Sequence, residues 1–373
     1  MNPRYGAKEA LIDVDQGPRR RAIIGCHGPW AWTSSAEEID MLAMALAPEG
    51  GRLLCSERPN PQLGPGELLL RVRACGVCRT DLHVVDGELA PVKASIIPGH
   101  EVVGVVEALA ADVTDFSIGE RLGAAWLAST CGRCRYCLED TENLCDRAEF
   151  NGWTRDGGYA ELMAVDARFC FRLAPAWTDV EAAPLLCAGL IGYRAWRKAC
   201  EPRPVRRLGL YGFGAAAHLL AQLAIAEGQE VFAFTRPGDR PAQDLALGLG
   251  CVWAGGSSQA PPVPLDAAIL FAAAGELVPL ALQAVRKGGT VVCGGIHMSD
   301  IPSFPYHLLW EERRLVTVAN LTRADAVDYL ARAARAGVRA HVTTYALRDA
   351  NRALSDLRSG AFSGAAVLRV GEG

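Results

Sequence analysis

The sequence predicts an α/β protein in which a β-rich domain accompanies a parallel, doubly wound sheet. From residue 41 onward, short apolar runs such as 102–106 and 121–127 are separated by Gly and Pro turns, which indicates short strands. From about residue 181 strands and helices alternate, as they do in a parallel sheet covered by helices. An apolar run at 208–211 leads through glycines into a helical pattern, the strand–turn–helix order of such a sheet.

The expected elements can be placed in order. In the first half, strands are expected at 41–46, 52–55, 67–74, 102–106 and 121–127. A helix is expected over 181–198, with Asp179 as its cap. The alternating half predicts strands at 208–211, 230–235, 266–271 and 290–293, and helices at 215–226, 242–249 and 278–286. The end of the chain predicts helices at 324–336 and 348–359 and strands at 343–345 and 365–370.

Composition and charge exclude several classes of function. The chain has 373 residues, enough for two domains, with a formal net charge of −4 and a pI near 6.0. A polyanionic partner such as nucleic acid is therefore not favoured. No apolar run reaches the roughly 18 residues of a spanning helix. We expect a soluble, cytoplasmic protein with neither nucleic acid nor membrane as a partner.

Residues 1–40 differ in character from the rest of the chain. Arg19, Arg20 and Arg21 precede an apolar stretch at 22–32, but Cys, His, Gly and Pro interrupt it at 26–29. With a broken apolar core and no clear small-residue cleavage site, this is a poor signal peptide. We interpret residues 1–40 as a loosely ordered N-terminal extension.

The cysteines point to metal. The thirteen cysteines are an odd number in a large chain, which argues against a disulfide framework. Four of them follow the pattern Cys131-x2-Cys134-x2-Cys137-x7-Cys145. Four thiolates so close together can bind one Zn²⁺ tetrahedrally and leave no position open, which is a structural zinc site. An iron–sulfur cluster is the chemical alternative, because its ligands are also four cysteines.

A second set of metal-binding residue types is spread along the chain. Cys75 and Cys78 lie in one segment, His100 in the next and Cys187 much later. Two cysteines and one histidine with an open position are a known ligand set for catalytic zinc. From spacing alone, ordinary buried thiols remain an equal alternative, since a lone buried cysteine is usually a small core residue.

The third signal is a glycine turn. Gly212, Phe213, Gly214, Ala215 and Ala216 follow a predicted strand and open a predicted helix. In that context the turn indicates a dinucleotide whose pyrophosphate lies at the helix N-terminus.

The expected acid of an NAD site, about 20 residues past the glycine turn, is missing. The strand at 230–234 is followed by Thr235 and Arg236 instead. Thr235 would not repel a 2′-phosphate, and Arg236 could pair with it. The sequence therefore favours NADP over NAD. The alternative is that Arg236 is a solvated loop residue and Asp239 serves NAD.

Together these pieces resemble a zinc-dependent alcohol dehydrogenase of the medium-chain dehydrogenase/reductase family, of the yeast and bacterial tetrameric type. The matching segments, in family order, are CGVCRTDLH, PGHE, CGRCRYC…C, TRDGGYAE, APLLCAG and GFG. The resemblance covers the chain from Met41 to its end. It implies a GroES-like β-barrel catalytic domain at 41–187 plus 321–373, interrupted by a Rossmann domain at 188–320.

The resemblance also implies a catalytic centre. Cys78, His100 and Cys187 would bind the catalytic zinc, and Cys75 would be only a neighbour. Asp81 would accept the other imidazole N–H of His100. Glu101 would do likewise or visit the metal during ligand exchange.

Proton transfer and coenzyme contacts follow from the same resemblance. Thr80 would hydrogen-bond the alcohol hydroxyl, and His83 would receive its proton through the nicotinamide ribose. The remaining implied contacts are Arg79 with the pyrophosphate, Gly295, Ile296 and His297 with the nicotinamide, and Trp126 with the substrate pocket. Thr317 and Val318 replace the family's Gly-Ser pair, which is a departure at a cofactor contact.

The implied reaction is reversible hydride transfer between a primary alcohol or aldehyde and a nicotinamide, with two zinc ions per chain. A homo-oligomer, dimer or tetramer, is implied by analogy. One alternative is a zinc-free enone or quinone reductase, against which the complete ligand sets argue. The other is a non-catalytic relative, against which Cys78, His100 and Thr80 argue.

The extension generates a prediction. Since residues 1–40 contain no motif of the family, a chain that begins at Met41 should keep near-full activity. The comparison is kcat/KM of the shortened and full chains on one alcohol. An insoluble or inactive shortened chain would show that the segment packs on the catalytic core.

Overall fold

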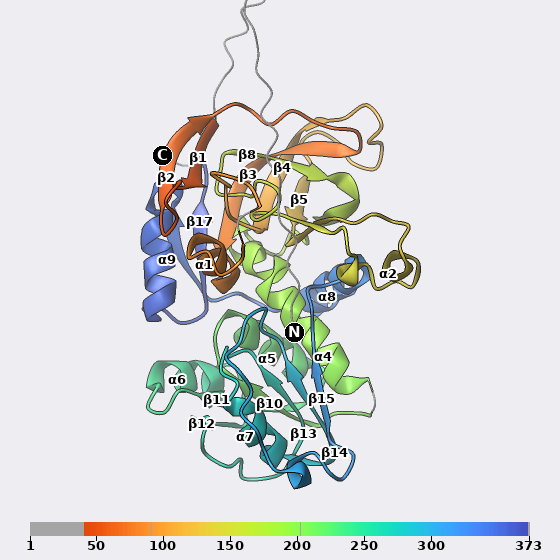
Figure 1. Cartoon of the computed structure of the whole chain (residues 1–373), viewed down its shortest axis with the longest axis vertical. Helices are drawn as coiled ribbons and strands as arrows, with labels where there is room; N and C mark the ends of the chain where they lie inside the picture. The colour runs from red at the N-terminus through yellow and green to blue at the C-terminus, as the bar shows by residue number, and fades with distance from the viewer. Residues whose placement is uncertain (1–40, 91, 202, 372–373) are drawn as a thin grey trace, which may run out of the picture. The chain divides into compact units, whose positions relative to one another are not determined.

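The computed structural model describes residues 41–90, 92–201 and 203–371, so the expectations for residues 1–40 lie outside it (Figure 1). The first sheet has seven strands. In spatial order they are β16 (Val342–Ala346), β17 (Ala365–Arg369), β3 (Glu67–Val77), β4 (Glu101–Leu109), β5 (Arg121–Ala124) and β9 (Cys170–Arg172), with β8 (Leu162–Asp166) paired to β3. Two antiparallel pairs accompany it, β1 (Met41–Leu46) with β2 (Leu53–Arg58) and β6 (Leu127–Ser129) with β7 (Glu149–Phe150).

Alternation explains the core of this part. Leu68, Leu70 and Val72 of β3 are buried, and the residues between them are more exposed. Because successive strand residues point to opposite faces, the three side chains share the core face. β16 and β17, from the end of the chain, complete the sheet that the first half begins. A catalytic domain interrupted in sequence is consistent with this pairing, while the boundaries at 187/188 and 320/321 stay predictions.

The second large sheet has six strands, all paired in parallel, in the order β12-β11-β10-β13-β14-β15 (Figure 1). Their bounds are β10 (Arg207–Tyr211), β11 (Glu230–Thr235), β12 (Trp253–Gly256), β13 (Leu265–Leu270), β14 (Val285–Cys293) and β15 (Arg314–Thr317). Numbered from β10, this is the strand order 3-2-1-4-5-6 of dinucleotide-binding sheets. The predicted α/β class and doubly wound sheet are confirmed.

Helices connect these strands and close the chain. They are α1 (Arg79–Val85), α2 (Arg135–Leu138), α3 (Asp179–Ala182), α4 (Ala188–Cys200), α5 (Ala215–Ala226), α6 (Arg240–Gly248), α7 (Leu277–Ala284), α8 (Arg323–Ala336) and α9 (Ala350–Ser359). Among the helices that the structure describes, none has both the length and the apolar character needed to cross a membrane.

The prediction of a single helix over 181–198 was wrong. Thr178, not Asp179, caps α3, and its hydroxyl accepts a hydrogen bond from the Glu181 amide. A 3-10 turn (Ala183–Leu186) follows, and Cys187 leaves helical geometry with φ −132 and ψ −65 before α4 begins. The proline at position 184 carries no N–H for a continuing helix. The break sets Cys187 at the start of α4.

Other local expectations were also corrected. The strand expected over 121–127 is two strands, because β5 ends at Ala124 and β6 begins at Leu127 in a different sheet. Strands β7, β8, β9, β12 and β15 and helices α1 and α2 were not predicted. Each has seven residues or fewer, too short for its pattern to show a period clearly.

Two buried polar contacts join α4 and α5 to the segments that follow the parallel sheet. Arg194 and Arg197 of α4 both form ion pairs with Asp325 of α8, and the Arg197–Asp325 distance is 2.7 Å. Asp325 is fully buried, and although burial opposes it, the Thr322 amide and Arg194 lower the pKa of this carboxyl. Breaking such a buried pair on one side costs roughly 3–5 kcal/mol.

His218 of α5 makes the second contact. Its Nε2 accepts a hydrogen bond from the His341 amide at 3.1 Å, and its Nδ1 lies 3.3 Å from the Gly214 carbonyl oxygen. These partners require the neutral ring with its proton on Nδ1. Burial lowers the pKa of His218 from 6.5 to about 4.

This pKa predicts an acid-sensitive contribution to stability. Because the folded pKa lies below the unfolded one, the contribution is complete above pH 6.5 and is lost as the pH falls towards 4. Between pH 7 and 5 the free energy of unfolding should fall by about 2 kcal/mol more in the wild type than in His218→Gln. Urea unfolding at both pH values measures it, with the exposed His307→Gln as control. Equal pH dependence of the wild type and His218→Gln would contradict the prediction.

Candidate metal and coenzyme sites

The four clustered cysteines meet around one point. All four sulfur atoms of Cys131, Cys134, Cys137 and Cys145 lie within 4.8 Å of one another. The Sγ atom of Cys137 lies 3.9 Å from that of Cys131 and 3.5 Å from that of Cys134. Sulfurs bound tetrahedrally at a Zn–S distance of about 2.3 Å would be about 3.8 Å apart. The separations exclude disulfides and fit a closed zinc site.

Backbone amides prepare this cluster for a cation. The Cys134 amide donates to the Cys131 sulfur at 3.3 Å, and the Arg147 amide donates to the Cys145 sulfur at 3.4 Å. Donation from the Arg133 amide is the main reason that the pKa of Cys131 falls to about 6. Thiolates are the form that binds metal.

The segment that carries the four cysteines, residues 131–145, is called the cysteine lobe below. It is attached to the chain segment that follows the last strand of the parallel sheet. The Asn143 side chain donates to the Ala319 carbonyl oxygen at 2.7 Å. Glu142 accepts from the Arg323 amide at 3.0 Å, at the first residue of α8. Folding of the lobe therefore helps to place α8 relative to the first sheet.

The second group of predicted ligands also comes together. Ligand atoms of Cys78, His100, Glu101 and Cys187 lie within 4.8 Å of one another, and the Cys78 Sγ is 3.0 Å from the His100 Nε2. His100 is 0% and Glu101 2% exposed. Cys75, in contrast, is a buried core residue outside this group, as expected of a neighbour.

Local structure orients the side chains of the candidate ligands towards one another. Cys78 is the N-cap of α1, and its amide donates to the Asp81 carboxylate at 2.8 Å. The other Asp81 oxygen lies 3.1 Å from the His100 Nδ1, so the imidazole directs Nε2 at the cluster. The contact between Asp81 and the His100 imidazole that the resemblance implied is thus present. Cys187 reaches the cluster from the break between α3 and α4.

Glu101 is held close to the ligands by a glycine. Gly76 of β3 faces Glu101 of β4 in the antiparallel register. A Cβ atom at Gly76 would lie 1.7 Å from a Glu101 carboxylate oxygen. The other oxygen, Oε1, is buried without a hydrogen-bond partner among the described residues. An unpartnered buried carboxylate oxygen beside three ligands fits a cation site.

Electrostatics support the same conclusion. A hydrogen bond from Cys187 outweighs burial and lowers the pKa of the Cys78 thiol well below its ordinary value. That contact and burial raise the pKa of Cys187, and burial with the Cys78 thiolate raises the pKa of Glu101. A bound divalent cation would balance the negative charge concentrated here and take up both thiolates.

The TRDGGYAE segment braces the loop that carries His100. The Gly157 amide donates to the Ile97 carbonyl at 2.7 Å, and the Gly158 amide donates to the Gly99 carbonyl at 3.0 Å. A Cβ atom at Gly157 would lie 2.0 Å from the Gly99 carbonyl oxygen. The two chain segments therefore approach so closely that only glycine fits.

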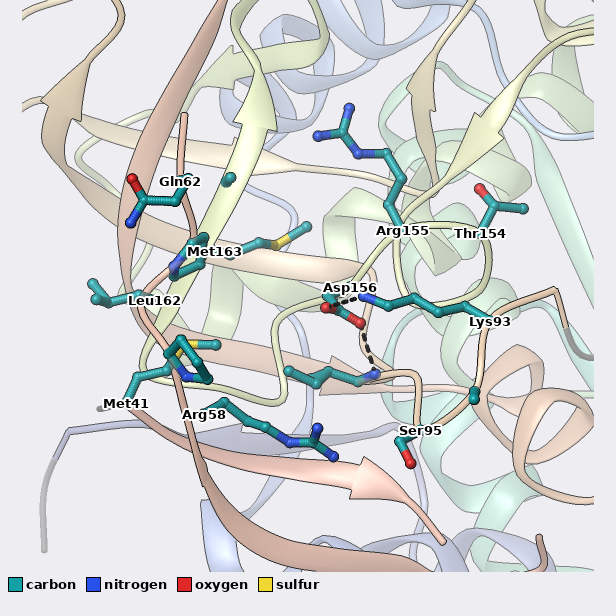
Figure 2. A pocket seen from close by; sticks show the side chains of 16 residues that line it. Met41, Arg58, Gln62, Lys93, Ser95, Thr154, Arg155, Asp156, Leu162 and Met163 are labelled. Carbon is teal, nitrogen blue, oxygen red and sulfur yellow. Dashed lines mark hydrogen bonds and ion pairs between the residues drawn. The ribbon is translucent and has the colours of Figure 1, made fainter. Parts of the chain in front are cut away.

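Asp156 and Lys93 form an ion pair at 2.5 Å on the wall of a cavity of about 460 Å³ (Figure 2). Asp156 also accepts from the Ile97 amide at 3.2 Å. None of the candidate zinc ligands lines this cavity. It is therefore separate from the metal site, and its walls support the His100 loop.

Aromatic rings cover one side of His100. The Trp126 ring meets the imidazole edge-on at 4.9 Å between centroids, and Trp153 stacks on Trp126 at 6.0 Å with 5° between planes. Phe150 completes the stack. Trp153 was missed because the matching segment of sequence begins one residue after it. Its indole donates to the Ala90 carbonyl, which holds the ring in place.

The predicted proton-transfer residues lie on α1. Thr80 lies two residues after the N-cap Cys78, and its amide donates to the Cys78 sulfur at 3.3 Å. His83 is buried one turn further along, with its Nδ1 paired to the carboxylate of Glu88. Its ring lies 5.4 Å from that of His297, from the segment after β14. Sequence reasoning did not single out Glu88, because its contact with His83 depends on the turn that ends α1.

The glycine turn has the predicted form. Gly212 follows β10 at φ +89, and a Cβ atom there would lie 2.9 Å from the Ala272 nitrogen. Gly214 is the N-cap of α5, which begins with Ala215 and Ala216, and Phe213 is buried beside them. No side chain caps the helix, so its first amides are free to bind a phosphate.

The residues after β11 divide into buried and exposed groups. Thr235 is buried, and its hydroxyl contacts the Arg236 carbonyl at 3.0 Å and accepts from Gln243. Asp239 accepts from the Ala242 amide as the N-cap of α6. Arg236 and Arg240 are exposed, and neither pairs with a carboxylate within the described ranges. Arg240 was not anticipated, although it stands only four residues after Arg236.

The remaining predicted coenzyme residues are exposed. Arg79 is the first residue of α1. Gly295, Ile296 and His297 follow β14, and Ile296 is 54% exposed although apolar. The His297–His83 contact connects this segment with α1. Two cysteines and a histidine with a buried carboxylate beside them, in a chain that also has a sheet with dinucleotide-binding strand order, are the residues expected of a zinc-dependent oxidoreductase.

Known proteins with similar sequences are alcohol dehydrogenases. The alcohol dehydrogenase GroES-like domain family matches residues 64–175. A probable alcohol dehydrogenase, AdhA, of Mycobacterium tuberculosis is 48% identical over 316 residues, covering 83% of this chain and 90% of that protein. An alcohol dehydrogenase of Geobacillus stearothermophilus is 35% identical over 326 residues, covering 85% and 95%.

A solved structure of similar fold is also an alcohol dehydrogenase. The cobalt- and zinc-bound thermostable alcohol dehydrogenase from Pyrobaculum aerophilum matches with a TM-score of 0.80 at 26% identity, covering 88% of this chain and 99% of that one. This chain belongs to the zinc-dependent alcohol dehydrogenases of the medium-chain dehydrogenase/reductase family, and it is an oxidoreductase. The GroES-like domain expected from the sequence is confirmed.

Proposed function

We propose that this protein catalyses reversible hydride transfer between a primary alcohol or aldehyde and C4 of a nicotinamide. The buried group of Cys78, His100 and Cys187 carries the proposal, because two cysteines and one histidine are the ligand set of catalytic zinc, in which the fourth position takes water or substrate; the Glu101 carboxylate lies beside them. Zinc bound there supplies Lewis acidity, which lowers the pKa of an alcohol or polarises a carbonyl. The glycine turn at Gly212 holds the coenzyme on the neighbouring sheet.

The chain's own residues then have distinct tasks. Asp81 orients the imidazole of His100, and Trp126 and Trp153 exclude water from that side. Thr80, two residues after the ligand Cys78, binds the alcohol hydroxyl. His83 takes the proton by way of the nicotinamide ribose, consistent with its contact to His297. An enone or quinone reductase without zinc would not need this ligand group.

We propose two zinc ions per chain, one in each group of ligands. The four-cysteine group has no open position and stabilises the lobe that contacts α8, while the Cys78 group is catalytic. Loss of the two metals should therefore have different consequences.

Elemental analysis should find about two zinc ions per chain in active protein. Cys134→Ser should retain about one and unfold at lower temperature, because structural zinc contributes to folding. Cys78→Ser should abolish turnover with the fold largely kept. The exposed Cys55→Ser is the control, and fully active protein with at most one zinc would refute the two-site proposal.

We propose NADP(H) as the preferred coenzyme. Support comes from Arg236 and Arg240, two exposed cations after β11, and from the absence of a carboxylate at Thr235. The alternative role of Asp239 is weakened, because its side chain caps α6. Preference for NADP(H) would favour aldehyde reduction in cells.

Arg236→Ala should lower kcat/KM for NADPH roughly tenfold or more and leave kcat/KM for NADH nearly unchanged, because the arginine would bind only the 2′-phosphate. Steady-state kinetics with one aldehyde measure both, and the exposed Arg52→Ala is the control. Equal or better use of NADH by the wild type, without a selective loss in Arg236→Ala, would refute the assignment.

We also propose a homo-oligomer, dimer or tetramer, by analogy with the family. Tyr306 and Trp310 support it, since they are 71% and 60% exposed and their rings lie 5.9 Å apart. They precede β15, the last strand of the parallel sheet, and exposed edges of this kind invite pairing.

We propose a cytoplasmic location. The unpaired cysteines of the described chain support a reducing compartment.

A further inference from the structure

Glu88 forms a carboxylate–histidine pair outside the metal ligands. Helix α1 ends at Val85, and Gly87 at φ +76 turns the chain back. The turn is closed by the Leu89 amide, which donates to the His83 carbonyl at 3.1 Å. It places the Glu88 carboxylate against Nδ1 of the His83 imidazole.

The carboxylate determines which nitrogen of the His83 ring carries the proton. With a carboxylate on Nδ1, the neutral imidazole carries its proton there, and the lone pair of Nε2 is free to accept a proton. Asp81 makes the same contact with Nδ1 of His100, at 3.1 Å. In that pair Nε2 faces the Cys78 sulfur, whereas His83 has the His297 ring as its aromatic neighbour. The same device thus serves a metal ligand and a residue on the coenzyme side.

We propose that Glu88 is a positioning residue for proton transfer. It fixes the Nδ1–H tautomer of His83, leaves Nε2 as the nitrogen that accepts a proton, and stabilises the imidazolium while the proton from the alcohol resides there. This is the role of the acid in a Ser-His-Asp triad, where the carboxylate orients the ring and does not take the proton. The inference rests on the relay function proposed for His83.

Exposure separates this role from a structural one. The His83 side chain is 9% exposed and that of Glu88 is 47% exposed, and within the described ranges the ion-pair partner of Glu88 is His83. A half-exposed ion pair contributes little to stability. Removal of the carboxylate should therefore leave the fold intact and change the chemistry.

The test uses the full-length zinc-loaded enzyme and a primary alcohol with the coenzyme saturating. Glu88→Gln, which keeps the shape and removes the charge, should lower kcat for alcohol oxidation roughly 10- to 100-fold. KM for the alcohol and the dissociation constant of NADPH, followed by its fluorescence, should change little. Glu88→Asp should recover most of the activity. Asp86→Asn is the matched control, because Asp86 lies in the same turn and pairs with Arg358 instead.

A double-variant cycle completes the test. In a His83→Gln background, Glu88→Gln should cause no further loss, since its effect acts through the histidine. Normal kcat in Glu88→Gln beside a slow His83→Gln overturns the role of Glu88 alone. An independent, additive loss in the double variant does so too. Normal kcat in His83→Gln overturns the relay itself, so the two failures are distinguishable.

Discussion

One buried carboxylate organises the candidate active site. Asp81 accepts hydrogen bonds from the Cys78 and Gly99 amides at 2.8 and 3.2 Å and contacts the His100 Nδ1 at 3.1 Å. These groups come from the start of α1 and from the loop before β4, so one side chain sets the distance between two proposed metal ligands, Cys78 and His100. Asp81 is 1% exposed, and its loss would leave buried donors unpaired at a cost of roughly 1–3 kcal/mol each.

Helix α1 is the element through which that constraint reaches the chemistry. Its N-cap, Cys78, is a proposed metal ligand, Thr80 lies in its first turn, and His83 lies near its end with Glu88 just beyond. A short helix fixed at its start by Asp81 therefore fixes all of them relative to the metal. Charge is arranged accordingly, with carboxylates and thiolates around the buried metal position and exposed arginines after β11, where a coenzyme phosphate would lie.

Contacts distant in sequence hold this arrangement to the coenzyme-binding sheet. Asp325 joins α8 to α4, His218 joins α5 to the segment before β16, and Asn143 joins the cysteine lobe to residue 319. Each is a hydrogen bond or ion pair with at least one buried partner, and such bonds are strongly directional. Burial of His218 makes part of this connection sensitive to acid, because its ring must stay neutral.

The sequence by itself determined the chemistry that depends on local spacing. Four cysteines in one short segment can reach a single ion, and glycines between a strand and a helix form a phosphate-binding turn, whatever surrounds them. Only the three-dimensional structure decided which side chains meet, both between distant segments and through local turns. Cys187 joins Cys78 because the chain breaks between α3 and α4, and Asp239 is engaged because it caps α6. Glu88 reaches His83 through a turn, and Trp153 stacks on Trp126 beside the paired strands β6 and β7. Such contacts are set by packing and backbone turns, which residue spacing does not encode.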